Sequence, residues 1–187
     1  NQKDETMDNQ QERFDLELPW FTGIIEGEGW VSLIFYKSNQ KNGKHTPALK
    51  GNIGVTNTDF IIMDKVAEIL KRYSIKYRYN YRKACIGSDN VSRKAKIELS
   101  VENQKSLRLL CNLLLPYMVG EKKSRVLNLI QFLNIRDSKP RSGPASKYGK
   151  EEFMHYKQMY KFKGKSRSKI LNDLTLDEIL KGFEDKV

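Results

Sequence analysis

The sequence predicts an α+β domain with core order α-β-β-α-β-β-α, in which helices cover one face of a four-stranded antiparallel sheet. Two observations support this prediction. Four short segments alternate apolar and polar residues, and the segments between them space apolar residues as a helix does. The 187 residues are 39% hydrophobic, which is enough for one domain with a good core, or at most a small second one.

The four strands are expected to form two hairpins. They are predicted at residues 31–36, 50–56, 77–82 and 94–101. Turn signals at Asn42-Gly43 and at residues 87–90 lie between the strands of each pair. Because the helices cover only one face, the other face is left exposed.

The exposed face is a candidate DNA-binding surface. Its residues are Ser32, Ile34, Tyr36, Ser38, Lys50, Asn52, Arg78, Asn80, Arg82, Lys96, Glu98 and Ser100. Most of these side chains can hydrogen-bond to bases or phosphates, and acids are scarce among them. An ordinary solvated sheet face is the alternative interpretation.

Helical spacing predicts five helices and a last one near the C-terminus. They are expected to begin at about Leu18, after Asn57 or Thr58, at Asn103, at Glu121, at Glu151 and after Thr175. The side chains of the second helix that should face the core are Phe60, Ile61, Met63, Val66, Ile69 and Leu70. Those of the fourth helix are Val126, Leu127, Leu129, Ile130 and Leu133.

A single domain is expected over residues 14–187. Residues 1–13 are polar and lack periodicity, so they are predicted to be a mobile tail. The rest divides into a core at 14–135, a basic loop at 136–150, and C-terminal helices with a second basic loop at 151–187. In that second loop, Lys165 and Arg167 are expected to contact DNA phosphates.

The balance of charge favours a polyanionic partner. Lys and Arg number 34 against 23 Asp and Glu, which gives a net charge of +11. Ribosomal and membrane-surface proteins can show the same surplus. No apolar run reaches the roughly 18 residues of a membrane span, so no membrane partner is expected.

The cysteines and histidines are too few and too scattered for a soft-metal site. Cys85 and Cys111 lie far apart, and His45 and His155 are the only histidines. This argues against zinc and excludes a histidine-rich site. Reduced thiols in an intracellular protein are expected, and an organelle (chloroplast or mitochondrion) and a prokaryotic cytoplasm both remain open.

The first helix has an unusual sequence. Gly23 and Gly27 share one face, although each helical glycine costs about 1 kcal/mol relative to alanine. Glu26 and Glu28 crowd the C-terminus, where the helix dipole is already negative. A divalent cation would compensate them; two solvated glutamates on a buried helix are the alternative.

The run Phe21-Thr22-Gly23-Ile24-Ile25-Glu26-Gly27-Glu28-Gly29 resembles the LAGLIDADG motif of homing endonucleases. The predicted order of elements also matches that family's fold. Only one copy of the motif is present, so the chain resembles the single-motif, homodimeric type. The resemblance implies that two motif helices pack together, with an interface made by Trp20, Gly23, Ile24 and Gly27.

The resemblance also implies the site residues. Glu28 occupies the position of the family's metal-binding carboxylate, and the Gly27 carbonyl precedes it. Asn57 matches a polar residue near the attacking water, and Lys122 or Lys123 matches a lysine of the active site. The implied cofactor is Mg²⁺, which Mn²⁺ or Ca²⁺ can replace for binding. A plain helix cap is the alternative for Asn57, and a surface charge for the lysines.

The function implied is that of an intron-encoded, site-specific homing endonuclease. It would use Mg²⁺ to break both strands of a long, partly palindromic DNA target and leave short 3′ overhangs. The alternative is an RNA maturase that binds its own intron RNA and assists splicing. A transcription factor that keeps the scaffold without catalysis is a third hypothesis, since fold alone does not decide function.

Overall fold

The computed structural model describes residues 16–39, 45–140, 147–161 and 181. The chain divides into two compact units, one of Asn1–Val31 and Asn52–Lys123, the other of Ser32–Gly51 and Ser124–Val187. Strands β1 (Gly29–Asn39) and β2 (His45–Asn57) pass from one unit into the other.

The main sheet has the four strands that were predicted, and their order is β1-β2-β6-β3. Strands β3 (Arg78–Arg82) and β6 (Lys96–Val101) pair antiparallel, and β6 also pairs antiparallel with β2. The strands β1 and β2 are longer than the sequence predicted, and β2 begins at His45 within the expected loop. The core-facing residues predicted for β6 are confirmed, because Ile97, Leu99 and Val101 are buried.

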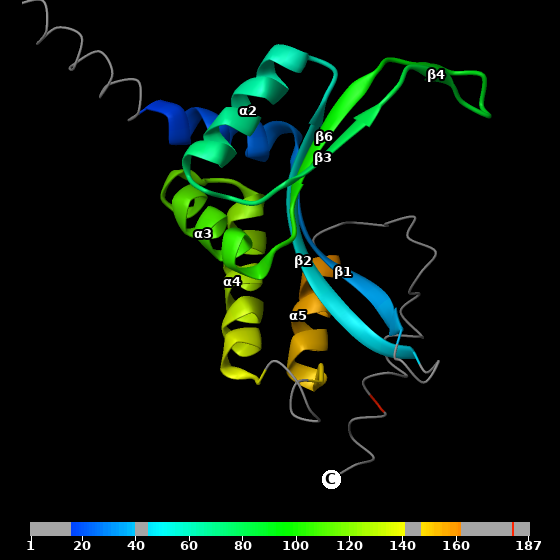
Figure 1. Ribbon diagram of the computed structural model, residues 1–187. Coiled ribbons are helices and arrows are strands. Elements are labelled where there is room, and N and C mark those ends of the chain that lie inside the picture. The colour runs from blue at the N-terminus through cyan, green and yellow to red at the C-terminus, as the bar shows by residue number, and fades with distance from the viewer. Residues whose placement is uncertain (1–15, 40–44, 141–146, 162–180, 182–187) are drawn as a thin grey trace, which may run out of the picture. The chain divides into compact units, whose positions relative to one another are not determined.

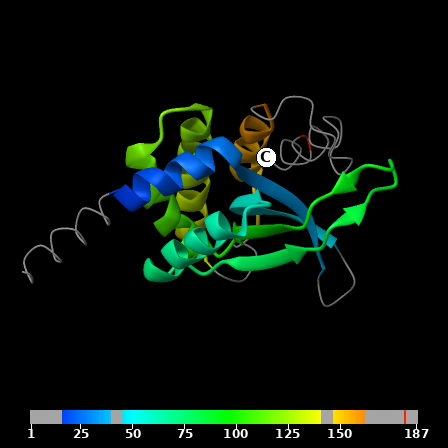
Figure 2. The same cartoon turned by 90° about the horizontal axis from the view of Figure 1, so that it is seen from above.

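The strands β3 and β6 continue into a narrow two-stranded ribbon (Figures 1 and 2). It consists of β4 (Cys85–Ile86) and β5 (Ser92–Arg93), which pair around the turn predicted at 87–90. Asn90 adopts the left-handed conformation there, with φ of 56°. Every residue of both strands is exposed, so the ribbon forms no part of the core.

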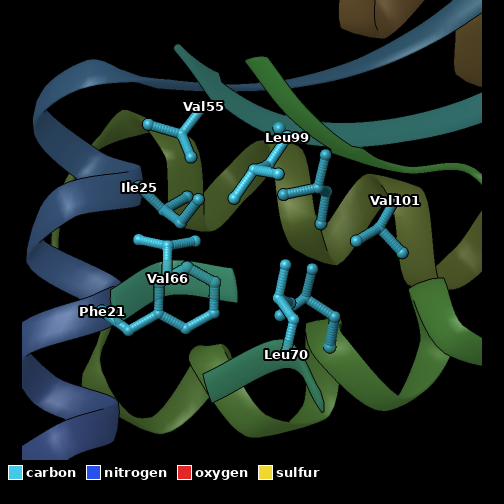
Figure 3. A pocket seen from close by; sticks show the side chains of 10 residues that line it. Phe21, Ile25, Val55, Val66, Leu70, Leu99 and Val101 are labelled. Atoms are coloured by element: carbon cyan, nitrogen blue, oxygen red, sulfur yellow. The ribbon is translucent and has the colours of Figure 1, made fainter. Parts of the chain in front are cut away.

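Three helices and the sheet enclose the core of the first unit. They are residues 16–28, called here the motif helix, with α2 (Phe60–Arg72) and α3 (Gln104–Leu114). Figure 3 shows Phe21 and Ile25 of the motif helix facing Val66 of α2 and Leu99 of β6. The cavity between them is about 10 Å³ and its walls are apolar, so it is a packing gap and not a ligand site.

The start of α2 differs from the prediction in two ways. Its N-cap is Asp59, whose carboxylate accepts from the Ile61 and Ile62 N–H groups at 2.9 and 3.2 Å, so neither Asn57 nor Thr58 is the cap. Phe60 and Ile61 are 42% and 82% exposed, because the helix starts beyond the edge of the core. The remaining core predictions for α2 are confirmed.

The third helix agrees with the prediction. The Asn103 side chain caps it by accepting from the Ser106 N–H at 3.1 Å. A 3₁₀ turn, η1 (Leu115–Tyr117), follows and contains Pro116, whose ring and missing N–H do not suit a continuing α-helix.

The second unit packs α4 (Glu121–Ser138, from Ser124 onward) and α5 (Lys150–Lys161) with the hairpin end of β1 and β2. The Phe35 ring of β1 lies 6.3 Å from that of Phe153 in α5. Along α4, Val126, Leu129 and Leu133 are buried as predicted, but Leu127 is 44% exposed.

Asn128 is buried instead of Leu127, because its amide is paired with His155. Its Nδ2 donates to the His155 carbonyl at 2.9 Å, and its Oδ1 lies 2.6 Å from His155 Nδ1. Burial lowers the pKa of His155 below its ordinary value.

Glu152 is the buried charge of the second unit. Its side chain is fully buried and accepts from Lys139 at 2.7 Å and from Arg136 at 3.0 Å. The Gly149 N–H donates to it as well, at 2.7 Å. Burial alone raises the pKa of this carboxyl, but these hydrogen bonds outweigh it and hold the pKa below its ordinary value.

Replacing Glu152 with Gln is expected to destabilise the protein by about 3 kcal/mol, because it leaves two cations facing a neutral group. Because the native pKa is lowered, the stabilisation from Glu152 is present at neutral pH and is lost as pH falls through that lowered value. Denaturant unfolding at pH 7 and below pH 4 checks both points. Glu151→Gln, at an exposed neighbour, is the matched control and should change little. Equal stability of the two variants at pH 7 would contradict the prediction.

No described helix is long and apolar enough to cross a membrane. Several predictions fall outside the described residues: the tail at 1–13, the Asn42-Gly43 turn, Lys165, Arg167 and the helix after Thr175.

Candidate active site and nucleic-acid surface

The motif helix ends in close contact with β2. A Cβ atom at Gly29 would lie 2.7 Å from the Ile25 carbonyl oxygen and 2.8 Å from that of Gly54. Such contacts are too short for any side chain, so glycine is required where the helix turns into β1. This close approach holds Glu28 near the end of β2.

Glu28 and Asn57 are hydrogen-bonded. Asn57 Nδ2 donates to Glu28 Oε2 at 2.6 Å, and both side chains have access to solvent. The Asn57 Oδ1 accepts from the Asp59 backbone N–H at 2.9 Å, which fixes the orientation of the amide. Two residues that the sequence placed in one site, 29 positions apart, are therefore brought together.

The structure distinguishes Lys122 from Lys123. Lys122 Nζ donates to the carbonyl oxygens of Ile25 and Glu26, at 2.9 and 2.6 Å. It therefore neutralises the negative end of the motif helix one turn or less from Glu28. For Lys123, the contact shown is that of its backbone N–H with the Gly120 carbonyl, at 3.0 Å.

Glu26 has a role that the sequence did not indicate. Its Oε1 accepts from the backbone N–H groups of Val119 and Gly120, at 3.0 and 2.8 Å. It is thus neither a plain solvated acid nor directed at Asn57. The one sequence signal for this role was an acid at the negative end of a helix dipole, because such an acid needs a hydrogen-bond donor or a cation nearby. The sequence alone could not identify that donor, which lies 93 residues away.

The donor set of this site suits a hard divalent cation only in part. The Glu28 carboxylate and the Gly27 carbonyl are oxygen ligands of the kind Mg²⁺ prefers. Among the described residues, no group of three His, Cys, Asp or Glu side chains could hold a metal. The described residues of one chain therefore offer only Glu28 and the Gly27 carbonyl as ligands at this site.

Thiol chemistry is not indicated at this site. Burial raises the pKa of Cys111 to about 12, so its thiol stays protonated at neutral pH. Cys85 is exposed in β4.

The outer sheet face of the first unit is basic at its edge. Arg78 and Arg82 of β3 are exposed, and Asn80 and Lys96 are half-buried, which leaves them accessible as predicted. Glu98 lies in the same row and pairs with Arg82 at 3.2 Å, so it offsets one of these charges.

Asn52 and Ser100 were predicted to be exposed on the middle of this face, but Trp30 covers it. Its ring covers Gly54, where a Cβ would lie 2.4 Å from Cζ2, and its Nε1 donates to Asn52 Oδ1 at 2.7 Å. Asn52 in turn donates to Glu102 at 3.0 Å. As a result Asn52 is only 5% exposed, and Ser100, the β6 partner of Gly54, only 4%. Neither is a solvent-facing group.

In the second unit the same row is more varied. Ser32 is buried, Ile34 and Lys50 are half-buried, and Tyr36 is 41% exposed. Ser38 belongs to β1, but its side chain lies outside the described part of the structure. Tyr36 and Lys50 therefore remain candidates for nucleic-acid contact, whereas Ser32 does not.

One face of the motif helix is exposed and apolar. Leu16 and Trp20 are 69% and 39% exposed, Ile24 is half-buried, and Gly23 and Gly27 lie on the same stripe. A Cβ atom at either glycine would meet nothing within 4 Å in the described residues. Packing within the described part of one chain therefore gives no reason for either glycine.

If this chain cuts DNA as its resemblance implies, replacing Asn57 with Ala should lower cleavage by about 10²-fold, because it releases the Glu28 carboxylate and a displacement near 1 Å can cost that much. Asn57→Asp should be worse, since it sets a second anion beside Glu28. Single-turnover cleavage rates check this, with the neighbouring exposed Thr58→Ala as the control. A rate for Asn57→Ala within threefold of that of the unmodified protein would contradict the assignment.

No family model matches the sequence, and no curated protein matches it. Solved structures do match. The homing endonuclease I-CvuI, bound to the I-CreI target with magnesium and with its DNA not cleaved, gives a TM-score of 0.62 at 18% identity over 92% of this chain and 98% of its own. The archaeal intron-encoded homing endonuclease I-Vdi141I, complexed with DNA, gives 0.64 at 18% identity over 91% and 96%.

The LAGLIDADG homing endonuclease I-GzeII, in complex with its DNA target, gives a TM-score of 0.55 at 14% identity, over 75% of this chain and 44% of its own. At identities this low, the likeness shows a shared fold and does not by itself show a shared function.

Proposed function

We propose that this chain, whose fold is that of the LAGLIDADG homing endonucleases, is an intron-encoded, metal-dependent enzyme that cuts both strands of a specific DNA site. The observation that supports this most is the geometry at Glu28. Its carboxylate stands at the end of the motif helix, is oriented by Asn57, and lies next to carbonyls that Lys122 holds. We expect the protein inside cells, in an organelle or a prokaryotic cytoplasm.

The active assembly is proposed to be a homodimer. An exposed apolar stripe on the motif helix and two glycines with open space above them fit the approach of a second copy. Small residues four apart allow two helix backbones to come close. The helical cost of about 1 kcal/mol for each glycine then has a compensating contact. Two-fold symmetry favours a partly palindromic target.

The partial ligand set fits the same assembly. Glu28 and the Gly27 carbonyl of each copy, with phosphate oxygens of the DNA, would complete an oxygen shell for Mg²⁺. Such a cation supplies neutralisation of the phosphate and activation of a water. Glu28 holds the cation, Asn57 restrains Glu28, and Lys122 keeps the helix end in place by its contacts with the Ile25 and Glu26 carbonyls. Mn²⁺ and Ca²⁺ are expected to substitute for binding.

DNA contact is proposed for the accessible part of the outer sheet face. In the first unit this is Arg78, Asn80, Arg82 and Lys96, and in the second Tyr36 and Lys50. Arginine and asparagine are suited to bidentate contact with bases, and lysine to phosphates. With a net charge of +11, the affinity should fall steeply as salt rises.

Cleavage of a plasmid library with a randomised insert tests this proposal. With Mg²⁺, the protein should linearise a small subset of plasmids and leave short 3′ overhangs at a related, partly palindromic sequence. With EDTA, all plasmids should stay intact. Absence of any selected cleavage across a range of salt and Mg²⁺ would overturn the proposal.

The maturase alternative has one observation in its favour. The acid at Glu26 is accounted for by its contacts with the Val119 and Gly120 amides, so it is no evidence for metal chemistry. Only Glu28 still favours cutting over simple binding. A splicing assay with the host intron, run beside the cleavage assay, separates the two functions.

A further inference from the structure

We propose that Glu26 is a positioning residue of the active site, which fixes the start of α4 and through it the ammonium group of Lys122. The inference rests on the proposed function for its catalytic consequence. Its structural part, that Glu26 clamps the residues before α4, stands on the contacts alone.

The two contacts run in opposite directions between the same segments. The Glu26 carboxylate reaches from the motif helix to the Val119 and Gly120 amides, at 3.0 and 2.8 Å. Lys122, two residues later, reaches back to the Ile25 and Glu26 carbonyls at 2.9 and 2.6 Å. The chain is thus hydrogen-bonded to the end of the motif helix both before and after the first residue of α4.

In this clamp each charged side chain is paired with backbone groups of opposite partial charge. A carboxylate that accepts two backbone N–H groups makes charge-assisted hydrogen bonds, which are stronger than neutral ones. Lys122 satisfies helix carbonyls that would otherwise lack partners and places a positive charge at the negative end of the dipole. If Glu26 released the loop, Lys122 would lose the anchor that sets its height along the helix.

Glu26 does not share the role of Glu28. Residues two apart on a helix differ by about 200° around its axis, so the two carboxylates face opposite sides. Glu28 is bonded by Asn57 at 2.6 Å, whereas Glu26 is bonded by the amides of residues 119 and 120. The chain therefore separates an acid for the metal from an acid for the scaffold.

Hydrogen exchange and cleavage kinetics on three variants test the proposal. Glu26→Ala should raise the exchange rates of the Val119 and Gly120 amides at least tenfold, and should lower kcat about 10²-fold with little change in DNA affinity. Glu26→Gln keeps an acceptor oxygen and should stay within about threefold of the unmodified protein in both measurements. Glu68→Ala removes an equal charge from an exposed site of α2 and should change neither measurement.

The outcomes are distinguishable. If Glu26→Gln is as inactive as Glu26→Ala and needs more Mg²⁺, Glu26 is a metal ligand and the proposal is wrong. Unchanged exchange in Glu26→Ala also overturns it. If Glu26→Ala does not fold, Glu26→Gln decides: exchange and cleavage close to those of the unmodified protein support the clamp, and loss of cleavage with a raised Mg²⁺ requirement overturns it. Slow exchange in a protein that cuts no DNA would leave the clamp intact and refute only the nuclease.

Discussion

Replacing Glu28 with Gln is expected to reduce DNA cleavage by about 10³-fold while leaving DNA affinity within a fewfold of its starting value. The change removes the charge that would hold the cation but keeps the size of the side chain and an oxygen facing Asn57. Loss of several kcal/mol of charge stabilisation in the transition state corresponds to that factor. Single-turnover cleavage with Mg²⁺ and binding with Ca²⁺ measure the two quantities.

The matched control is Glu68→Gln, the same substitution at an exposed site of α2. Because Glu68 is exposed and has no assigned role in cleavage, that variant should keep its activity. Similar losses in the two variants, or full activity of Glu28→Gln, would show that Glu28 does not have the role assigned to it.

Replacing Gly23 and Gly27 together with Leu is expected to convert the protein from a dimer, with about twice the chain mass of 21.8 kDa, to a monomer. Among the described residues nothing lies within 4 Å of a Cβ at either glycine, so leucine should be accepted within one chain and even favour the helix. In the dimer the same side chains would force two helices apart. Sedimentation equilibrium measures the mass, and denaturant unfolding checks that the monomer stays folded.

The control for this prediction is Gly120→Ala, at a glycine away from the exposed stripe, which should leave the mass unchanged. Cleavage should disappear together with the dimer in the Gly23/Gly27 variant. A double variant that keeps the dimer mass, or an unmodified protein that is monomeric with and without DNA, would exclude this interface.

The order and faces of the elements could be predicted because they follow from local patterns. A period of two in β6 placed Ile97, Leu99 and Val101 in the core, and the motif placed Glu28 at a helix end. The prediction of exposure failed where a distant segment covers part of the sheet face. Asn52 and Ser100 alternate correctly, yet Trp30 covers their part of the face, and only the fold brings its ring there.

The site was predictable to the extent that one motif describes it. By resemblance Asn57 was expected near the attacking water, and the structure shows it hydrogen-bonded to Glu28 at 2.6 Å. Lys122 and Lys123 differ by one residue of register at the start of α4, and Lys122 is the one whose ammonium group contacts the end of the motif helix. The partner of Glu26 lies 93 and 94 residues away on a segment with no motif, so no local signal could identify it.

Each of two copies is proposed to contribute one Glu28 to the cutting of one DNA strand. A heterodimer with one unmodified chain and one Glu28→Gln chain, purified through two affinity tags, tests this on supercoiled target plasmid. We expect nicked circles as the product, with the break on one defined strand. Linear DNA formed at the rate of the unmodified dimer, or no break in either strand, would contradict it.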